Sequence, residues 1–260
     1  MKHLATGIVA LILCAGASSG AEGPGGPKTY QGEWSLNNWK PGDSLRLELT
    51  RRTSTSSWTW SSDFPLSDLS GLTREQLHAA RTAVSFTIDR DAGAFVFDGT
   101  VMLGLGRGGY RFVPNPAFAP ELRALGYGDL GEDDTFAMAL RDVSLSFARD
   151  ARRLSPQIAE TKDLVRLRDR GVDGDFLRAL ADSGYTGLTA EDVVKLRERG
   201  VDAGFVKGLV AAGLGRASVE EIIRLREHGV DVAYVARVRA SGFENLTVEQ
   251  IVRLHDHGVD

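Results

Sequence analysis

Apolar and polar residues alternate with two different periods along this chain, and the change of period divides it into two parts. Before Val113 the apolar residues recur at every second position, as in Leu45, Leu47 and Leu49, which are separated by polar residues. Successive side chains of a strand point to opposite faces, so this pattern predicts strands with one dry face. After Pro116 the apolar residues recur at helical spacing instead. The sequence therefore predicts an α+β protein with a small antiparallel β-sheet domain followed by helices.

The same alternation predicts the remaining strands of the first part. They centre on Trp58 and Trp60, on Val84 to Ile88, on Phe95 to Phe97, and on Tyr110 to Val113. A short helix is expected between the first and second of these, with Thr73 as N-cap and Gln76 completing a capping box. We place this β domain at residues 34–115.

The second part is periodic, with valines and aromatic residues each repeating every 29 residues. The valines are Val143, Val172, Val201, Val230 and Val259, and the aromatic residues are Phe118, Phe147, Phe176, Phe205 and Tyr234. A fixed short period indicates units that bury their apolar faces by stacking on one another. We therefore expect residues 116–260 to form an α-helical solenoid of 29-residue helix-turn-helix repeats.

Capping residues predict where the two helices of each unit begin and end. The expected N-caps are Thr189, Ser218 and Thr247 for the first helix, and Asp173, Asp202 and Asp231 for the second. The expected glycine ends are Gly171, Gly200, Gly229 and Gly258 for the first helix, and Gly184, Gly213 and Gly242 for the second. The second unit is degraded, with looser packing expected between Ala151 and Glu160, and the last unit is incomplete.

The amino-terminal residues have the pattern of a secretory signal. Residues 1–21 combine a short basic start with an apolar run and small residues, with cleavage expected after Ala21 or, alternatively, Ala17. Residues 22–33 are rich in glycine and proline, which predicts a flexible leader. We therefore expect a periplasmic or secreted protein. Leu13, directly before Cys14, argues against a lipid anchor at that cysteine.

Composition narrows the function classes further. The chain has 31 basic and 35 acidic residues and a net charge of −4, so no nucleic-acid partner is expected. Cys14 is the only cysteine and lies within the signal, so a thiol enzyme and a disulfide framework are both excluded for the mature chain. No later segment is apolar for long enough to span a membrane.

Two sets of residues are candidate binding sites. Arg166, Lys195, Arg224 and Arg253 share one repeat position, while Arg168, Arg197, Arg226 and His255 share another. Stacked units would align them as a basic ridge suited to an anionic partner. The competing interpretation is neutralisation by the acidic column one residue further on, which consists of Asp169, Glu198, Glu227 and Asp256. Trp58 and Trp60 share a strand face, and they form either part of the core or a platform for a glycan or small ligand.

The evidence for catalysis is weak. Gly104 to Gly109 contains the spacing G-x-G-x-x-G, but a strand rather than a helix is expected after it, so a hairpin turn is predicted. His228, His255 and His257 support only a distant alternative, a metal-dependent enzyme, because further ligands are missing. We expect no catalytic residue, cofactor or metal. The leading hypothesis is a noncatalytic interaction or regulatory protein that binds a protein partner through its helical repeats.

The run Tyr110 to Phe118, the exit Leu125-Gly126-Tyr127 and the corner His228-Gly229-Val230-Asp231 resemble an uncharacterised bacterial extracytoplasmic repeat region. Similar regions follow the protease domain in some membrane zinc metallopeptidases of the beta-lactam-sensor type. The resemblance covers residues 34–260. The chain lacks His-Glu-x-x-His, so the resemblance does not imply peptidase activity here.

Overall fold

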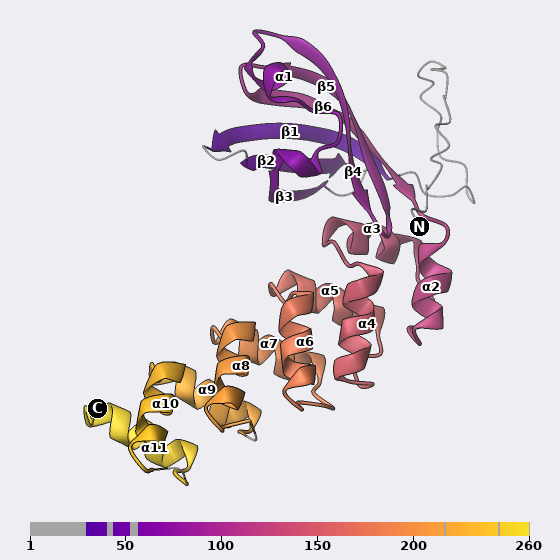
Figure 1. Cartoon of the computed structure of the whole chain (residues 1–260). Helices are drawn as coiled ribbons and strands as arrows, with labels where there is room; N and C mark the ends of the chain where they lie inside the picture. The colour runs from indigo at the N-terminus through magenta and orange to yellow at the C-terminus, as the bar shows by residue number, and fades with distance from the viewer. Residues whose placement is uncertain (1–29, 41–43, 53–56, 216, 244, 260) are drawn as a thin grey trace, which may run out of the picture.

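The computed structural model describes residues 30–40, 44–52, 57–215, 217–243 and 245–259. It shows a six-stranded antiparallel sheet followed by a helical region (Figure 1). The predicted signal peptide, Cys14 and residues 22–29 of the predicted leader lie outside the described ranges. Within those ranges, none of the helices has the length and apolar character needed to cross a bilayer.

The sheet consists of two three-stranded meanders that are joined where β1 pairs with β6. The strands are β1 (Gln31–Lys40), β2 (Ser44–Arg52), β3 (Ser57–Pro65), β4 (Thr82–Arg90), β5 (Gly93–Met102) and β6 (Leu105–Pro114). Their spatial order is β3-β2-β1-β6-β5-β4. The predicted flexible leader extended to residue 33, whereas β1 already begins at Gln31, because Tyr30 is buried and stacks on Phe136.

The sheet curls, so that its two edge strands approach each other without pairing. The guanidinium of Arg90 on β4 lies 5.8 Å from the ring centre of Phe64 on β3. The inner face carries the leucines of β2 and the aromatic residues of β4 and β5, all buried as the alternation predicts. The predicted short helix, α1 (Arg74–His78), has the expected capping box between Thr73 and Gln76 and follows a 3-10 turn at Leu66–Asp68.

Glycines let an indole lie close to the sheet. A Cβ at Gly106 or Gly108 would stand 2.7 Å from atoms of the Trp34 side chain, which is 2% exposed. Only Gly104 of the glycine run belongs to the hairpin loop, with φ of +82° beside Leu103 at +49°. The expected hairpin is thus confirmed at Gly104, whereas Gly106 and Gly108 lie within β6 and make room for the tryptophan.

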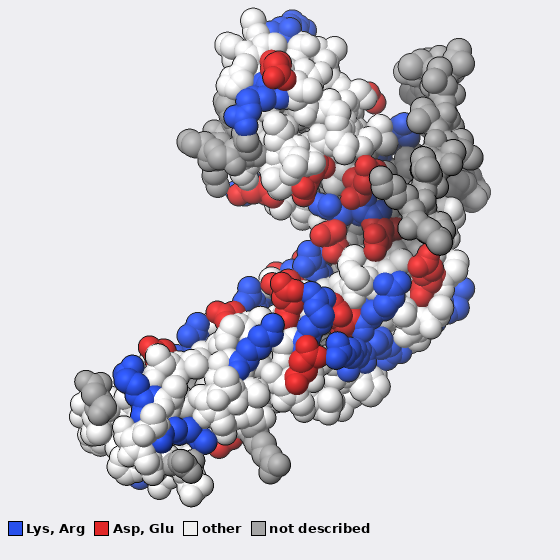
Figure 2. All heavy atoms as spheres, viewed as in Figure 1, with Lys and Arg blue, Asp and Glu red and all other residues white. Residues whose placement is uncertain are grey.

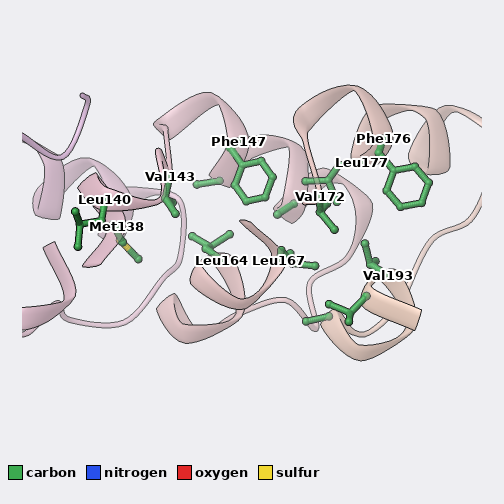
Figure 3. Close-up of a cluster of buried hydrophobic side chains, with 14 of the residues drawn as sticks. Met138, Leu140, Val143, Phe147, Leu164, Leu167, Val172, Phe176, Leu177 and Val193 are labelled. Atoms are coloured by element: carbon green, nitrogen blue, oxygen red, sulfur yellow. The ribbon is translucent and has the colours of Figure 1, made fainter. Parts of the chain in front are cut away.

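In the part of the chain that the structure describes, ten helices follow the sheet. They are α2 (Phe118–Ala124), α3 (Glu132–Leu140), α4 (Leu145–Leu154), α5 (Thr161–Asp169), α6 (Gly174–Asp182), α7 (Ala190–Glu198), α8 (Ala203–Ala211), α9 (Val219–Glu227), α10 (Val232–Ala240) and α11 (Val248–Asp256). The odd-numbered helices from α3 contact one another in succession, and so do the even-numbered helices. Apolar side chains from the two rows point toward one another, as Figure 3 shows for Val143, Phe147 and Leu164.

The predicted caps account for the helix boundaries. Thr189, Ser218 and Thr247 each form a capping box, and Asp173, Asp202 and Asp231 each accept a hydrogen bond from the backbone three residues later. The expected glycine ends all have positive φ. Packing between Ala151 and Ile158 is closer than expected, with Ala151, Ser155 and Ile158 fully buried. Ala148 is also fully buried, and its carbonyl oxygen accepts a hydrogen bond from the Tyr127 hydroxyl at 3.0 Å.

A compact junction holds the sheet against the first helices. Phe136 of α3 packs against Tyr30 at 4.6 Å and Phe112 at 5.4 Å between ring centres. Asp142, at the end of α3, pairs with Arg90 of β4 at 3.3 Å and with Arg168 of α5 at 3.4 Å. Asp142 has φ of +53° at the repeat position where the later units have glycine.

Candidate binding surfaces

A groove of about 320 Å³ lies at the junction between sheet and helices. Its lining includes Tyr30, Arg51, Trp58, Phe136 and Arg141. Trp58 is half-buried, and its ring meets that of Phe136 edge-on at 5.9 Å. The guanidinium of Arg51 lies 4.8 Å above the Tyr30 ring, a cation–π arrangement. The groove therefore combines an aromatic wall with two cationic side chains and the carboxylate of Asp133.

Trp60 does not share this groove. It is half-buried beside Phe64, with ring centres 6.0 Å apart. Both Trp58 and Trp60 pack against the buried core on the same face of β3, as the alternation predicts. The structure thus places one of the two candidate tryptophans, Trp58, where a ligand has access from a groove.

The candidate cations of the helical region lie on successive odd-numbered helices. Arg166, Lys195, Arg224 and Arg253 are all exposed, on α5, α7, α9 and α11 respectively. Lys195 pairs with Glu191 at 3.1 Å, and Arg253 pairs with Glu249 at 2.6 Å, both within one helix. Arg166 and Arg224 form no ion pair with any residue in the described part of the chain. None of the four is used to join one unit to the next.

The second basic column has a structural role that the sequence did not reveal. Arg168, Arg197 and Arg226 each donate a 2.9 Å hydrogen bond from Nε to a backbone carbonyl oxygen at the end of the previous odd-numbered helix. Each guanidinium also lies over the ring of a preceding phenylalanine, at 4.7 to 5.8 Å from its centre. These side chains therefore staple neighbouring units together and are not available as a binding ridge.

Each residue of the acidic column has an ion-pair partner outside the two basic columns. Asp169, Glu198, Glu227 and Asp256 pair respectively with Arg141, Arg170, Arg199 and His228, each from the preceding unit. Figure 2 accordingly shows positive and negative side chains interspersed along much of the helical region. These four carboxylates therefore pair with the end of the preceding odd-numbered helix rather than with the candidate basic columns.

Two of the three candidate histidines, His228 and His255, make separate contacts. His228 pairs with Asp256 at 3.0 Å, and His255 meets the Tyr234 ring edge-on at 4.9 Å. Among the described residues, no three His, Cys, Asp or Glu side chains gather in an arrangement suited to a metal ion.

The groups with clearly shifted pKa values in the core are tyrosines. Burial raises the pKa of Tyr110 to about 12, and burial also raises the pKa values of Tyr127 and Tyr185. These phenols stay protonated at neutral pH, so burial moves them away from a role as a general base.

Comparison with known proteins adds no relative: no family model, curated protein or solved structure matches the chain. The surfaces described above therefore carry the functional argument by themselves.

Proposed function

We propose that the protein is a noncatalytic, extracytoplasmic interaction or regulatory protein whose helical region is a solenoid of 29-residue helix-turn-helix repeats. In this proposal a protein partner binds along the odd-numbered helices. The secretory pattern of residues 1–21 supports the location, and the repeated contacts between units support the solenoid.

One observation favours this surface over the others. Of the two basic columns, the Arg168 column joins units, whereas Arg166, Lys195, Arg224 and Arg253 remain exposed at one repeat position. Exposed pairs within a helix are weak, so Lys195 and Arg253 can exchange their carboxylate partners for those of a bound protein. The expected partner therefore carries acidic residues along an elongated surface.

Two charge variants of the full chain test the proposal. Arg166→Gln with Arg224→Gln removes two cations from the odd-numbered helices, and Arg149→Gln with Lys207→Gln removes two exposed cations from the even-numbered row. Crosslinking in the native envelope, followed by mass spectrometry, identifies the captured protein. We expect capture to fall only for the first variant. Equal capture by both variants would refute the odd-numbered surface as the binding site.

A second candidate function, glycan or small-ligand binding, rests on the junction groove. Trp58 lines this groove, whose cationic neighbours are Arg51 and Arg141. Tryptophan fluorescence titrated with oligosaccharides would test it, with Trp60→Phe as the control and Trp58→Phe as the variant. Saturable quenching that disappears only in Trp58→Phe would support a ligand site on the β domain.

A further inference from the structure

The hairpin between β5 and β6 ends in a cluster of exposed apolar side chains. Met102, Leu103 and Leu105 are 51%, 71% and 55% exposed. The loop lies at the opposite end of these strands from Phe95 and Phe112, which contact α3 through Phe136. The hairpin tip, defined here as residues 102–105, is thus presented away from the helical region.

The residue at the turn is poorly suited to its backbone conformation. Leu103 has φ of +49° in a two-residue loop, where asparagine, aspartate or glycine is preferred. A bulky apolar residue in the left-handed region is strained and, when 71% exposed, gains little from burial within the chain. Folding therefore does not explain the leucine, whereas contact with an apolar environment outside the chain does.

Two backbone amides of the hairpin tip are hydrogen-bonded within the chain, so they do not need water as a partner. The amide of Leu103 donates to the Ala79 carbonyl oxygen at 2.9 Å, and the amide of Gly104 donates to the Leu77 carbonyl oxygen at 2.7 Å. Unpaired amides are costly to remove from water. Because these two are paired with the end of α1, the tip enters an apolar phase without exposing them.

Cationic side chains flank the apolar tip. Arg81 and Arg107 are exposed and form no ion pair with any residue of the described ranges. Together with Met102 and Leu105 they line an open hollow of about 1170 Å³. The acidic residues of this hollow are Glu33, which bonds Arg52 at 3.5 Å, and Glu48, on the β1 and β2 side.

We propose that the hairpin tip inserts into the surface of a lipid bilayer that carries anionic phospholipid headgroups. The leucines and Met102 enter the boundary of the acyl chains, while Arg81 and Arg107 contact phosphate groups. Apolar residues beside basic ones are the combination that binds such an interface. Exposed apolar side chains with cations beside them fit a bilayer surface that carries anionic headgroups.

A vesicle-binding experiment tests the insertion of the hairpin tip directly. The full chain is sedimented with phosphatidylcholine vesicles, with and without phosphatidylglycerol. The tip variant is Leu103→Ser/Leu105→Ser. The control variant, Val210→Ser/Phe243→Ser, removes exposed apolar residues of the helical region instead. We expect the tip variant to bind anionic vesicles at least about tenfold more weakly and the control to bind as the parent does. Arg81→Gln/Arg107→Gln should weaken binding only to the anionic vesicles.

A fluorescent probe at the hairpin tip reports on insertion of the tip itself, so vesicle binding through residues 1–21 does not affect the result. Leu103→Cys in a Cys14→Ser background is labelled with an environment-sensitive nitrobenzoxadiazole group. A blue shift on adding anionic vesicles supports insertion. An unshifted spectrum, or unchanged sedimentation of the tip variant, would overturn the proposal.

Discussion

Substitutions at Asp142 should separate backbone strain from charge at the junction between sheet and helices. Asp142 joins three parts of the chain, because its carboxylate pairs with Arg90 at 3.3 Å and Arg168 at 3.4 Å. Its φ of +53° lies in the left-handed region, which asparagine and glycine adopt more easily than alanine does.

The expected losses of stability follow from the two ion pairs of Asp142 and from the strain of its backbone. Each partly exposed ion pair contributes about 0.5–1 kcal/mol to the free energy of unfolding, so Asp142→Asn should lose about 1–2 kcal/mol. Asp142→Gly loses the same pairs but relieves about 1 kcal/mol of strain, which leaves a net loss of about 0–1 kcal/mol. Asp142→Ala loses the pairs and increases the strain, so its expected loss is about 2–3 kcal/mol.

Urea denaturation with two probes measures these losses. All four tryptophans lie within residues 34–60, so their fluorescence reports on the sheet, while circular dichroism at the helical minimum reports mainly on the helical region. The two transitions should coincide in the parent and separate in Asp142→Ala, because the junction is weakened. Equal losses for Asp142→Gly and Asp142→Ala would refute the strain argument. An unchanged Asp142→Asn would refute the contribution of the ion pairs.

Three further predictions concern the staples, the glycines and the buried phenol. Arg197→Ala should lower the free energy of unfolding by about 1–2 kcal/mol in urea, whereas Lys195→Ala, on the same helix, should change it by less than about 0.5 kcal/mol. Gly108→Ala should lower the melting temperature, with a cost of about 1–3 kcal/mol, because its Cβ would stand 2.0 Å from a carbonyl oxygen; Gly109→Ala, with its nearest neighbour at 3.8 Å, should be tolerated. Because its folded pKa is raised from 10.0 to about 12, Tyr110 contributes a stability that is complete below pH 10 and lost as the pH rises toward 12; unfolding measured across this range should show a smaller alkaline loss in Tyr110→Phe.

The sequence predicted those features that depend on local chemistry. Helix ends were correct at Thr189 and Gly200, because a hydroxyl cap and a left-handed glycine act on their own neighbouring backbone. Asp142 was missed because an aspartate at a glycine position interrupts the pattern, and only its partners explain it.

Features that depend on how strands and helices pack against one another could not be predicted from the pattern of apolar and polar residues. Alternation shows which face of a strand is dry, but it does not show that β1 pairs with β6. It also places Trp58 on the inner face without showing that Phe136 leaves part of its ring accessible from a groove. The ion-pair partners of the acidic column could not be assigned for the same reason, since they depend on how successive odd-numbered helices approach one another.

The pairing of β1 with β6 has a consequence for how the chain acquires its structure during synthesis. Gln31, at the start of the sheet, pairs with Arg111, near the end of its last strand, so the sheet is incomplete until β6 has been made. Contacts between distant parts of a chain form slowly, whereas the helical units contact mainly their sequence neighbours and fold rapidly. Until β6 arrives, β1 presents an unpaired edge that can associate with other chains. Closure of the sheet is therefore expected to limit the folding rate, and the interval before it is when the chain is most prone to aggregate.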